Sequence, residues 1–111
     1  MSLTLYGLKN CDTCKKALNA LEAAGRTVEF VDIRAEADLS TLLPVWLNEA
    51  GSDILINRRS TTWRNLSDGE RAGEPLALLM QHPTLIKRPV IDADGHVQVG
   101  WAKSVQAALI P

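Results

Sequence analysis

The sequence predicts an α/β fold in which a mixed four-stranded sheet is interrupted by a helical insertion. Three observations predict it. The chain opens with an apolar run, a helical stretch and a second apolar run; its middle is helical; and two short apolar runs around Asp94-Gly95 precede a last helical stretch. This order of elements is that of a thioredoxin-like fold, expected here as one domain over residues 1–111 with the insertion at about 38–82.

The first three elements form a β-α-β unit. A strand is expected over Leu3–Tyr6, a helix over residues 12–24 that ends at Gly25, and a second strand over Val28–Asp32. Because one helix connects the two strands, we expect them to be parallel with a right-handed crossover.

The middle of the chain predicts short helices. One is expected over Asp38–Ala50, with Pro44 tolerated only in its first turn, and a helical turn follows over Ser52–Ile56. Asn57–Leu66 has no clean period and is predicted to be a loop. The remaining expected features are a capping box at Ser67–Glu70 and a helix that Pro75 starts and that ends before His82.

The last elements are a hairpin and a helix. Strands are expected over Val90–Asp92 and His96–Val99, because Asp94-Gly95 between them is a strong turn signal. A final helix is expected over Ala102–Leu109.

Composition excludes several classes of function. A formal net charge of −1 gives no overall basic field for nucleic acid. No apolar run approaches the ~18 residues of a membrane span, so we expect a cytoplasmic protein. Neither a dinucleotide fingerprint nor a Walker loop is present, and two cysteines with two isolated histidines do not make a closed zinc site. No bound cofactor and no metal are therefore expected.

The most informative motif is Cys11-Asp-Thr-Cys14, at the predicted junction of the first strand and the first helix. The free N–H groups and dipole of a helix N-terminus stabilise an anion, and the thiolate is the reactive form of cysteine. We therefore expect Cys11 to be a thiolate of lowered pKa. Neighbouring polar residues are expected to contact the substrate: Lys9, Asn10 and Thr13.

Cys14 has two interpretations. It begins an apolar stripe that continues through Ala17, Leu18 and Leu21, so it is expected to be shielded where Cys11 faces solvent. It is then either the resolving thiol of a redox pair or simply a small core residue.

Aromatic and histidine residues have plainer interpretations. Trp46, Trp63 and Trp101 are expected in the core or lining a pocket. His82 is expected at a helix end and His96 on the exposed hairpin.

Three segments together resemble the arsenate reductase-like (ArsC/Spx) family, most closely its YffB-like branch. They are the opening around Cys11, the loop Asn57–Leu66, and His82-Pro-Thr-Leu-Ile-Lys-Arg88-Pro89. The resemblance implies a thioredoxin-like fold, a catalytic cysteine at Cys11 and a cis-proline at Pro89 beside it. Only an X-Pro bond adopts cis at low cost. Arg88 would then be held facing Cys11, where a guanidinium can bind a thiolate or a carboxylate.

The other arginines suggest an anion pocket. Arg58, Arg59 and Arg64 fall in the predicted loop beside Trp63 and are expected to form one cationic wall. The resemblance also implies a third arginine after the hairpin in arsenate reductases, but this chain offers only Lys103 there. An oxyanion needs several convergent donors, so this difference argues against efficient arsenate reduction.

Three functions follow from the resemblance and the residues. The first is a thiol-disulfide oxidoreductase that uses glutathione as co-substrate, with catalytic residues Cys11, Cys14 and Arg88. The second is a glutathione-dependent arsenate reductase. The third is an Spx-like regulator that binds the RNA polymerase α subunit when its CxxC is oxidised.

Overall fold

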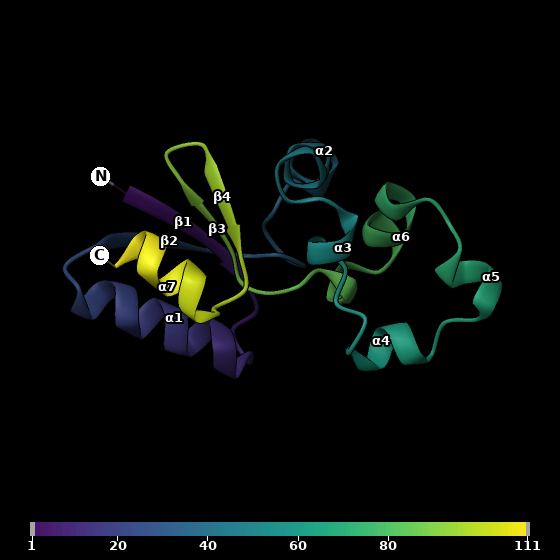
Figure 1. Cartoon of the computed structure of the whole chain (residues 1–111), viewed down its shortest axis with the longest axis horizontal. Coiled ribbons are helices and arrows are strands. Elements are labelled where there is room, and N and C mark those ends of the chain that lie inside the picture. The colour runs from purple at the N-terminus through teal and green to yellow at the C-terminus, as the bar shows by residue number, and fades with distance from the viewer. Residues whose placement is uncertain (1, 111) are drawn as a thin grey trace. The chain divides into compact units, whose positions relative to one another are not determined.

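The computed structural model describes residues 2–110, which divide into two compact units (Figure 1). The first unit comprises the chain up to Ala37 and from Arg88 onward; the second is Asp38–Lys87. No helix within residues 2–110 has the length and apolar character needed to cross a membrane.

The first unit contains β1 (Ser2–Gly7), α1 (Asp12–Ala23), β2 (Thr27–Asp32), β3 (Val90–Ala93), β4 (His96–Val99) and α7 (Lys103–Leu109). The second contains α2 (Leu39–Ala50), α3 (Ser52–Leu55), α4 (Thr61–Arg64), α5 (Asp68–Arg71), α6 (Pro75–Gln81) and the 3-10 helix η1 (Pro83–Leu85).

The sheet of the first unit has the strand order β2-β1-β3-β4. β1 pairs in parallel with β2 and antiparallel with β3, and β3 pairs antiparallel with β4. The mixed four-stranded sheet, the parallel β-α-β opening and the thioredoxin-like fold predicted from the sequence are therefore confirmed. The observed insertion runs to Lys87, a few residues beyond its expected end.

One face of this sheet packs on two helices. α1 and α7 run along the same side of the strands (Figure 1). Alternate residues of β1 point toward them because successive side chains of a strand face opposite ways. The buried cluster contains Leu3, Leu5, Cys14, Ala17, Leu21, Ile91, Val105 and Leu109. Cys14, in the first turn of α1, is thus buried in this core, and Cys11 packs against it.

The hairpin between β3 and β4 has the predicted turn. Asp94 has φ 54° and Gly95 φ 89°, the two positive values that a type I′ turn requires. The Oδ1 atom of Asp92 accepts a hydrogen bond from the Gly95 N–H at 2.8 Å.

The second unit has its own core around Trp46, which is buried as predicted. An isolated bridge pairs Ile56 with Ile86, and the Lys87 N–H donates to the Leu55 carbonyl at 2.8 Å. Buried apolar residues come from most elements of the unit: Leu43, Leu55, Leu66, Leu78, Leu79 and Leu85.

Two predictions in this unit are wrong. Pro44 lies in the second turn of α2, not the first. A proline there removes one N–H, whose partner would be the carbonyl of Ser40, and Ser40 is exposed, so solvent can hydrate that carbonyl. The predicted loop contains α4, a single turn too short to show a period, which begins where the Ser60 Oγ accepts the Trp63 N–H at 3.1 Å.

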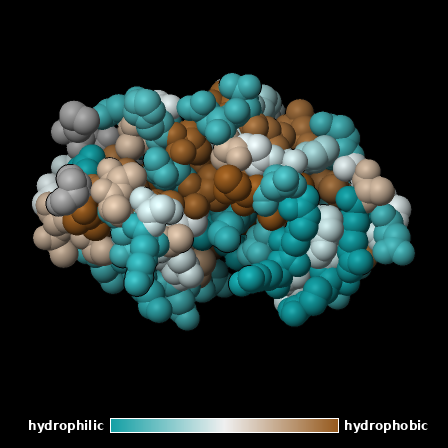
Figure 2. Space-filling view, viewed as in Figure 1, coloured by the Kyte–Doolittle hydropathy of each residue, from teal (hydrophilic) through white to brown (hydrophobic). Residues whose placement is uncertain are grey.

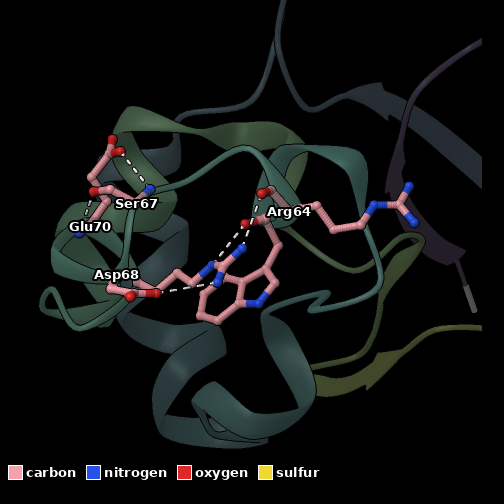
Figure 3. Close-up of polar contacts among 6 residues, drawn as sticks. Arg64, Ser67, Asp68 and Glu70 are labelled. Atoms are coloured by element: carbon pink, nitrogen blue, oxygen red, sulfur yellow. Dashed lines mark hydrogen bonds and ion pairs between the residues drawn. The ribbon is translucent and has the colours of Figure 1, made fainter.

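α4 and α5 are held together by the side chain of Arg71. Its Nε donates to the Trp63 carbonyl at 3.1 Å and its Nη2 to the Arg64 carbonyl at 3.0 Å. The guanidinium also lies 5.6 Å from the centre of the Trp63 ring. Figure 3 shows these contacts beside the predicted capping box, in which Ser67 and Glu70 exchange hydrogen bonds.

Replacing Arg71 with alanine is expected to lower the free energy of unfolding by about 1–2 kcal/mol, since two carbonyls lose their donor and the Trp63 ring its cation. Chemical denaturation would measure the loss. Arg59→Ala is the matched control: Arg59 is exposed, and its removal should change stability by less than about 0.5 kcal/mol. Equal effects in the two variants would contradict a bracing role for Arg71.

Candidate active site

Cys11 is the N-cap residue of α1, directly after the turn that follows β1. Its backbone is extended, with φ −94° and ψ 117°, and its N–H donates to the Leu8 carbonyl at 3.1 Å. The side chain is half-buried. Cys11 therefore lies at the N-terminal tip of α1, as the sequence predicted.

The surroundings of Cys11 favour its ionised form. Partial burial acts to raise the pKa of the thiol, but hydrogen bonds from the thiol and backbone N–H of Cys14 oppose it, as do the charge and hydrogen bond of Arg88. The net result is a pKa of Cys11 below that of an ordinary cysteine. This direction is the one predicted, although two neighbouring side chains contribute that the helix-dipole argument did not include.

Cys14 behaves oppositely. Burial raises the pKa of its thiol to about 12, and the hydrogen bond it donates to Cys11 acts in the same direction. Cys14 also belongs to the buried cluster under the sheet. Cys14 is therefore a core residue, which is one of the two interpretations left open by the sequence, and it also donates a hydrogen bond to the half-buried Cys11. Its role as a resolving thiol stays a prediction.

Gly7, at the end of β1, makes room for this arrangement. A Cβ atom added to Gly7 would lie 2.6 Å from the Cys14 Sγ, closer than any real contact. Only glycine therefore lets Cys14 pack in its present position. Sequence reasoning missed this residue; the signal was a glycine at the end of a predicted strand, four residues before Cys11.

Arg88 and Pro89 lie where the resemblance implied. The Arg88–Pro89 peptide bond is cis. Pro89 is buried, and its carbonyl accepts the Gly100 N–H at 2.8 Å. Arg88 is half-buried and hydrogen-bonds Cys11. The structure thus brings together Cys11, Cys14 and Arg88 within the first unit.

Other expected substrate-binding residues surround Cys11. Lys9, Asn10 and Thr13 are all exposed, the first two in the turn before α1 and Thr13 in its first turn. Lys9 also borders a cavity with Leu8, Lys15, Leu18 and Phe30. Sequence reasoning placed Leu18 on the buried face of a helix and Phe30 in a strand, and it did not predict the cavity.

The remaining predicted arginines belong to the second unit and have separate surroundings. Arg58 pairs with Asp53 at 3.6 Å and lies 5.3 Å from the Trp63 ring centre. Arg64 donates to the Thr61 Oγ1 at 3.2 Å, and its side chain points away from Asp68 in Figure 3. Arg59 is exposed. Hydrophilic side chains gather over α4 in Figure 2. A role for the three in binding substrate stays a prediction.

The histidines and the third tryptophan take ordinary positions. His82 is the C-cap residue of α6, and His96 is exposed on the hairpin. Trp101 is half-buried against the core of the first unit. In the part of the chain that the structure describes, no three His, Cys, Asp or Glu side chains gather as metal ligands would.

Comparison with known proteins identifies the family. The sequence profile of the ArsC family matches residues 6–108. The chain belongs to the ArsC family. It is 40% identical to an uncharacterized protein of Haemophilus influenzae over 96% of this chain and 97% of that one.

Two further relatives place this ArsC-family protein more finely. The solved structure of a protein named YffB superimposes with a TM-score of 0.86 at 32% identity, covering 99% of this chain and all of the other. The global transcriptional regulator Spx of Streptococcus pneumoniae is 29% identical over 98% of this chain and 86% of its own. The predicted resemblance to the ArsC/Spx family and to YffB is therefore confirmed.

The opposite pKa shifts predict the order in which the cysteines react. Alkylation requires the thiolate, so a lowered pKa brings the half-maximal rate for Cys11 below the ordinary pH of about 8.5, whereas Cys14 stays protonated far above it. Mass spectrometry of iodoacetamide-treated protein across pH would measure both rates. A half-maximum for Cys11 at pH 8.5 or higher would contradict the electrostatic account.

Proposed function

We infer that this protein is a cytoplasmic thiol-disulfide oxidoreductase that uses the Cys11 thiolate as nucleophile and glutathione as reductant. The observation that carries the inference is the contrast within one CxxC motif: the pKa of Cys11 is lowered, while that of Cys14 is raised to about 12. Disulfide exchange needs one ionised, accessible thiol, and a neighbouring thiol that stays protonated does not compete with it. Cys11 is the ionised and accessible thiol, and Cys14 is the thiol that stays protonated.

The first chemical step is attack on a mixed disulfide. The Cys11 thiolate bonds to one sulfur of the substrate, the substrate S–S bond breaks, and the other half leaves as a thiolate with the electron pair. Arg88, already hydrogen-bonded to the Cys11 sulfur, can stabilise negative charge there or hold a carboxylate of the substrate.

The second step releases the half bound to Cys11. A thiolate of glutathione attacks the mixed disulfide, or Cys14 does so and forms a Cys11–Cys14 disulfide that two further glutathiones reduce. Two of the causes that keep Cys14 protonated, the hydrogen bond to Cys11 and the Cys11 charge, disappear once Cys11 is bonded to substrate. Burial persists, however, and this favours glutathione as the resolving thiol.

Local charge supports glutathione as co-substrate. Glutathione carries two carboxylates, and cationic side chains lie around Cys11 on a chain of nearly neutral net charge: Arg88 beside the sulfur, and Lys9 and Lys15 along the adjoining turn and helix. Charge-assisted bonds to carboxylates are among the stronger hydrogen bonds.

Arsenate reduction is a weaker candidate. The chain has no arginine after Arg88, so the convergent set of guanidiniums that an oxyanion needs is incomplete. The similarity to Spx favours instead a second candidate, a redox-sensing regulator in which a Cys11–Cys14 disulfide alters binding to the RNA polymerase α subunit.

One preparation can distinguish these functions. A glutathione-coupled assay compares a glutathione mixed disulfide with arsenate, and a pull-down with purified α subunit is run on the reduced and the oxidised protein. We expect turnover of the mixed disulfide, little arsenate reduction, and loss of turnover in Cys11→Ser.

The Cys14→Ser variant identifies the resolving thiol. Retained turnover assigns resolution to glutathione, and lost turnover assigns it to Cys14. Turnover that survives in Cys11→Ser, or binding of the α subunit that depends on oxidation without any turnover, would overturn the proposed enzyme.

A further inference from the structure

The first unit contains a cavity of about 170 Å³ beside the cysteine loop. Its walls come from three elements that the β-α-β unit brings together: the turn after β1 supplies Leu8 and Lys9, α1 supplies Lys15 and Leu18, and β2 supplies Phe30. The mechanism described above uses Lys9 and Lys15 only as positive charge near Cys11 and places no part of the substrate in the cavity.

The cavity adjoins Cys11 through the backbone. The Leu8 carbonyl accepts the Cys11 N–H at 3.1 Å, and the Lys15 N–H donates to the Cys11 carbonyl at 3.0 Å. Two of its five lining residues are therefore hydrogen-bonded to the backbone of Cys11, so the cavity is lined by the same turn and first helical turn that carry the proposed nucleophile.

The lining surface is mostly apolar, and two of its five residues are lysines. Leu18 and Phe30 are half-buried and pack on the core of the unit, whereas the two lysines are exposed. Within residues 2–110, neither Lys9 nor Lys15 forms an ion pair. A cavity of roughly 150 Å³ with apolar walls accommodates one benzene ring, so this one matches a single aromatic ring or a short branched chain.

We propose that this cavity is a specificity pocket for disulfides in which one half carries an apolar group bearing a carboxylate. The inference rests on the proposed function, since it assigns the substrate class of the same thiolate. The ring or branched chain lies on Leu18 and Phe30, and the carboxylate lies between the ammonium groups of Lys9 and Lys15. In the reaction the Cys11 thiolate bonds to one substrate sulfur, the substrate S–S bond breaks, and the released half leaves as a thiolate.

Three symmetrical disulfides separate the two requirements. The disulfide of para-mercaptobenzoate carries both ring and carboxylate, its neutral amide carries the ring alone, and the disulfide of mercaptoacetate carries the carboxylate alone. Second-order rate constants are measured on the full-length protein above the Cys11 pKa and divided by those of free glutathione thiolate, which removes intrinsic reactivity. We expect the corrected rate constant of the first disulfide to exceed that of each of the other two by about fivefold or more. A preference of this size is what one modest contact supplies.

A pair of adjacent lysines supplies the matched control. Lys15→Gln should reduce the ratio of the corrected rate constant for the carboxylate probe to that for the amide probe by about threefold or more. Lys16→Gln removes the same charge from an exposed residue that does not line the cavity, and it should leave this ratio within about twofold of its wild-type value. Leu18→Ala should reduce the advantage of the ring. Circular dichroism checks that each variant is folded. Equal losses in the two lysine variants, or equal corrected rates for all probes, would overturn the pocket.

A readout without Cys11 chemistry separates this proposal from the proposed function. In Cys11→Ser, benzoate should shift the methyl NMR signals of Leu8 and Leu18, and benzamide should shift them less. Shifts of this kind without turnover of glutathione disulfides would overturn the enzyme and support the pocket. Turnover with no such shifts, and no preference among the probes, would overturn the pocket and leave the enzyme.

Discussion

Replacing Arg88 with alanine is expected to slow thiol exchange by about ten- to a hundredfold, equivalent to roughly 1.4–2.8 kcal/mol of transition-state stabilisation. The guanidinium contributes both charge and a hydrogen bond to the lowered pKa of Cys11. Its removal should therefore raise that pKa, so the thiolate fraction at neutral pH falls. The rate should recover as the pH rises through the new pKa, whereas any contact between Arg88 and a substrate carboxylate stays lost at every pH.

Two variants make this test specific. Arg88→Lys keeps the charge without the planar fork, so a partial loss of rate is expected. Lys87→Ala removes a neighbouring charge from an exposed residue and should change neither rate nor titration. The measurements are thiolate absorbance against pH and the rate with a glutathione mixed disulfide. Identical titrations and rates for wild type and Arg88→Ala would eliminate the role assigned to Arg88.

Replacing Gly7 with alanine is expected to lower the free energy of unfolding by about 1–3 kcal/mol, the usual cost of overpacking a core. The new Cβ would lie 2.6 Å from the Cys14 Sγ and 3.4 Å from the Leu5 Cδ2, and both side chains are fully buried. Cys14 must move, and the hydrogen bond that it donates to Cys11 weakens. The same substitution should therefore raise the pKa of Cys11 as well.

Gly69→Ala is the matched control for this substitution. A Cβ at Gly69 would come no closer than 4.0 Å to the Ser67 Oγ, and the residue lies in α5, where alanine is the better helix former. Denaturation should show unchanged or slightly higher stability. The double variant Gly7→Ala/Cys14→Ala removes the clashing sulfur and should recover part of the loss. A Gly7→Ala protein as stable as wild type, with an unchanged Cys11 titration, would refute the packing argument.

Local patterns were sufficient for most of the fold. The strand-helix-strand opening, the Asp94-Gly95 turn and the Ser67–Glu70 capping box depend on interactions within a few residues, which composition and spacing reveal directly. The two wrong predictions concern the position of Pro44 in α2 and the loop that contains α4. Pro44 is accommodated beyond the first turn because only one carbonyl loses its donor, and α4 is too short to produce a period.

The sequence by itself determined the class of fold, the place of Cys11 at the tip of a helix, and the shielding of Cys14 by the stripe that it begins. Only the tertiary structure decided what surrounds those thiols. The hydrogen bond to Cys11 from Cys14, the space that Gly7 leaves for Cys14, and the cavity beside Leu8 depend on folding of the chain in three dimensions. The contact of Arg88 with Cys11 was expected only from the family resemblance, not from local patterns. Arg88 is far from Cys11 in sequence, and a thiol pKa depends on distances of a few ångströms, which periodicity does not encode.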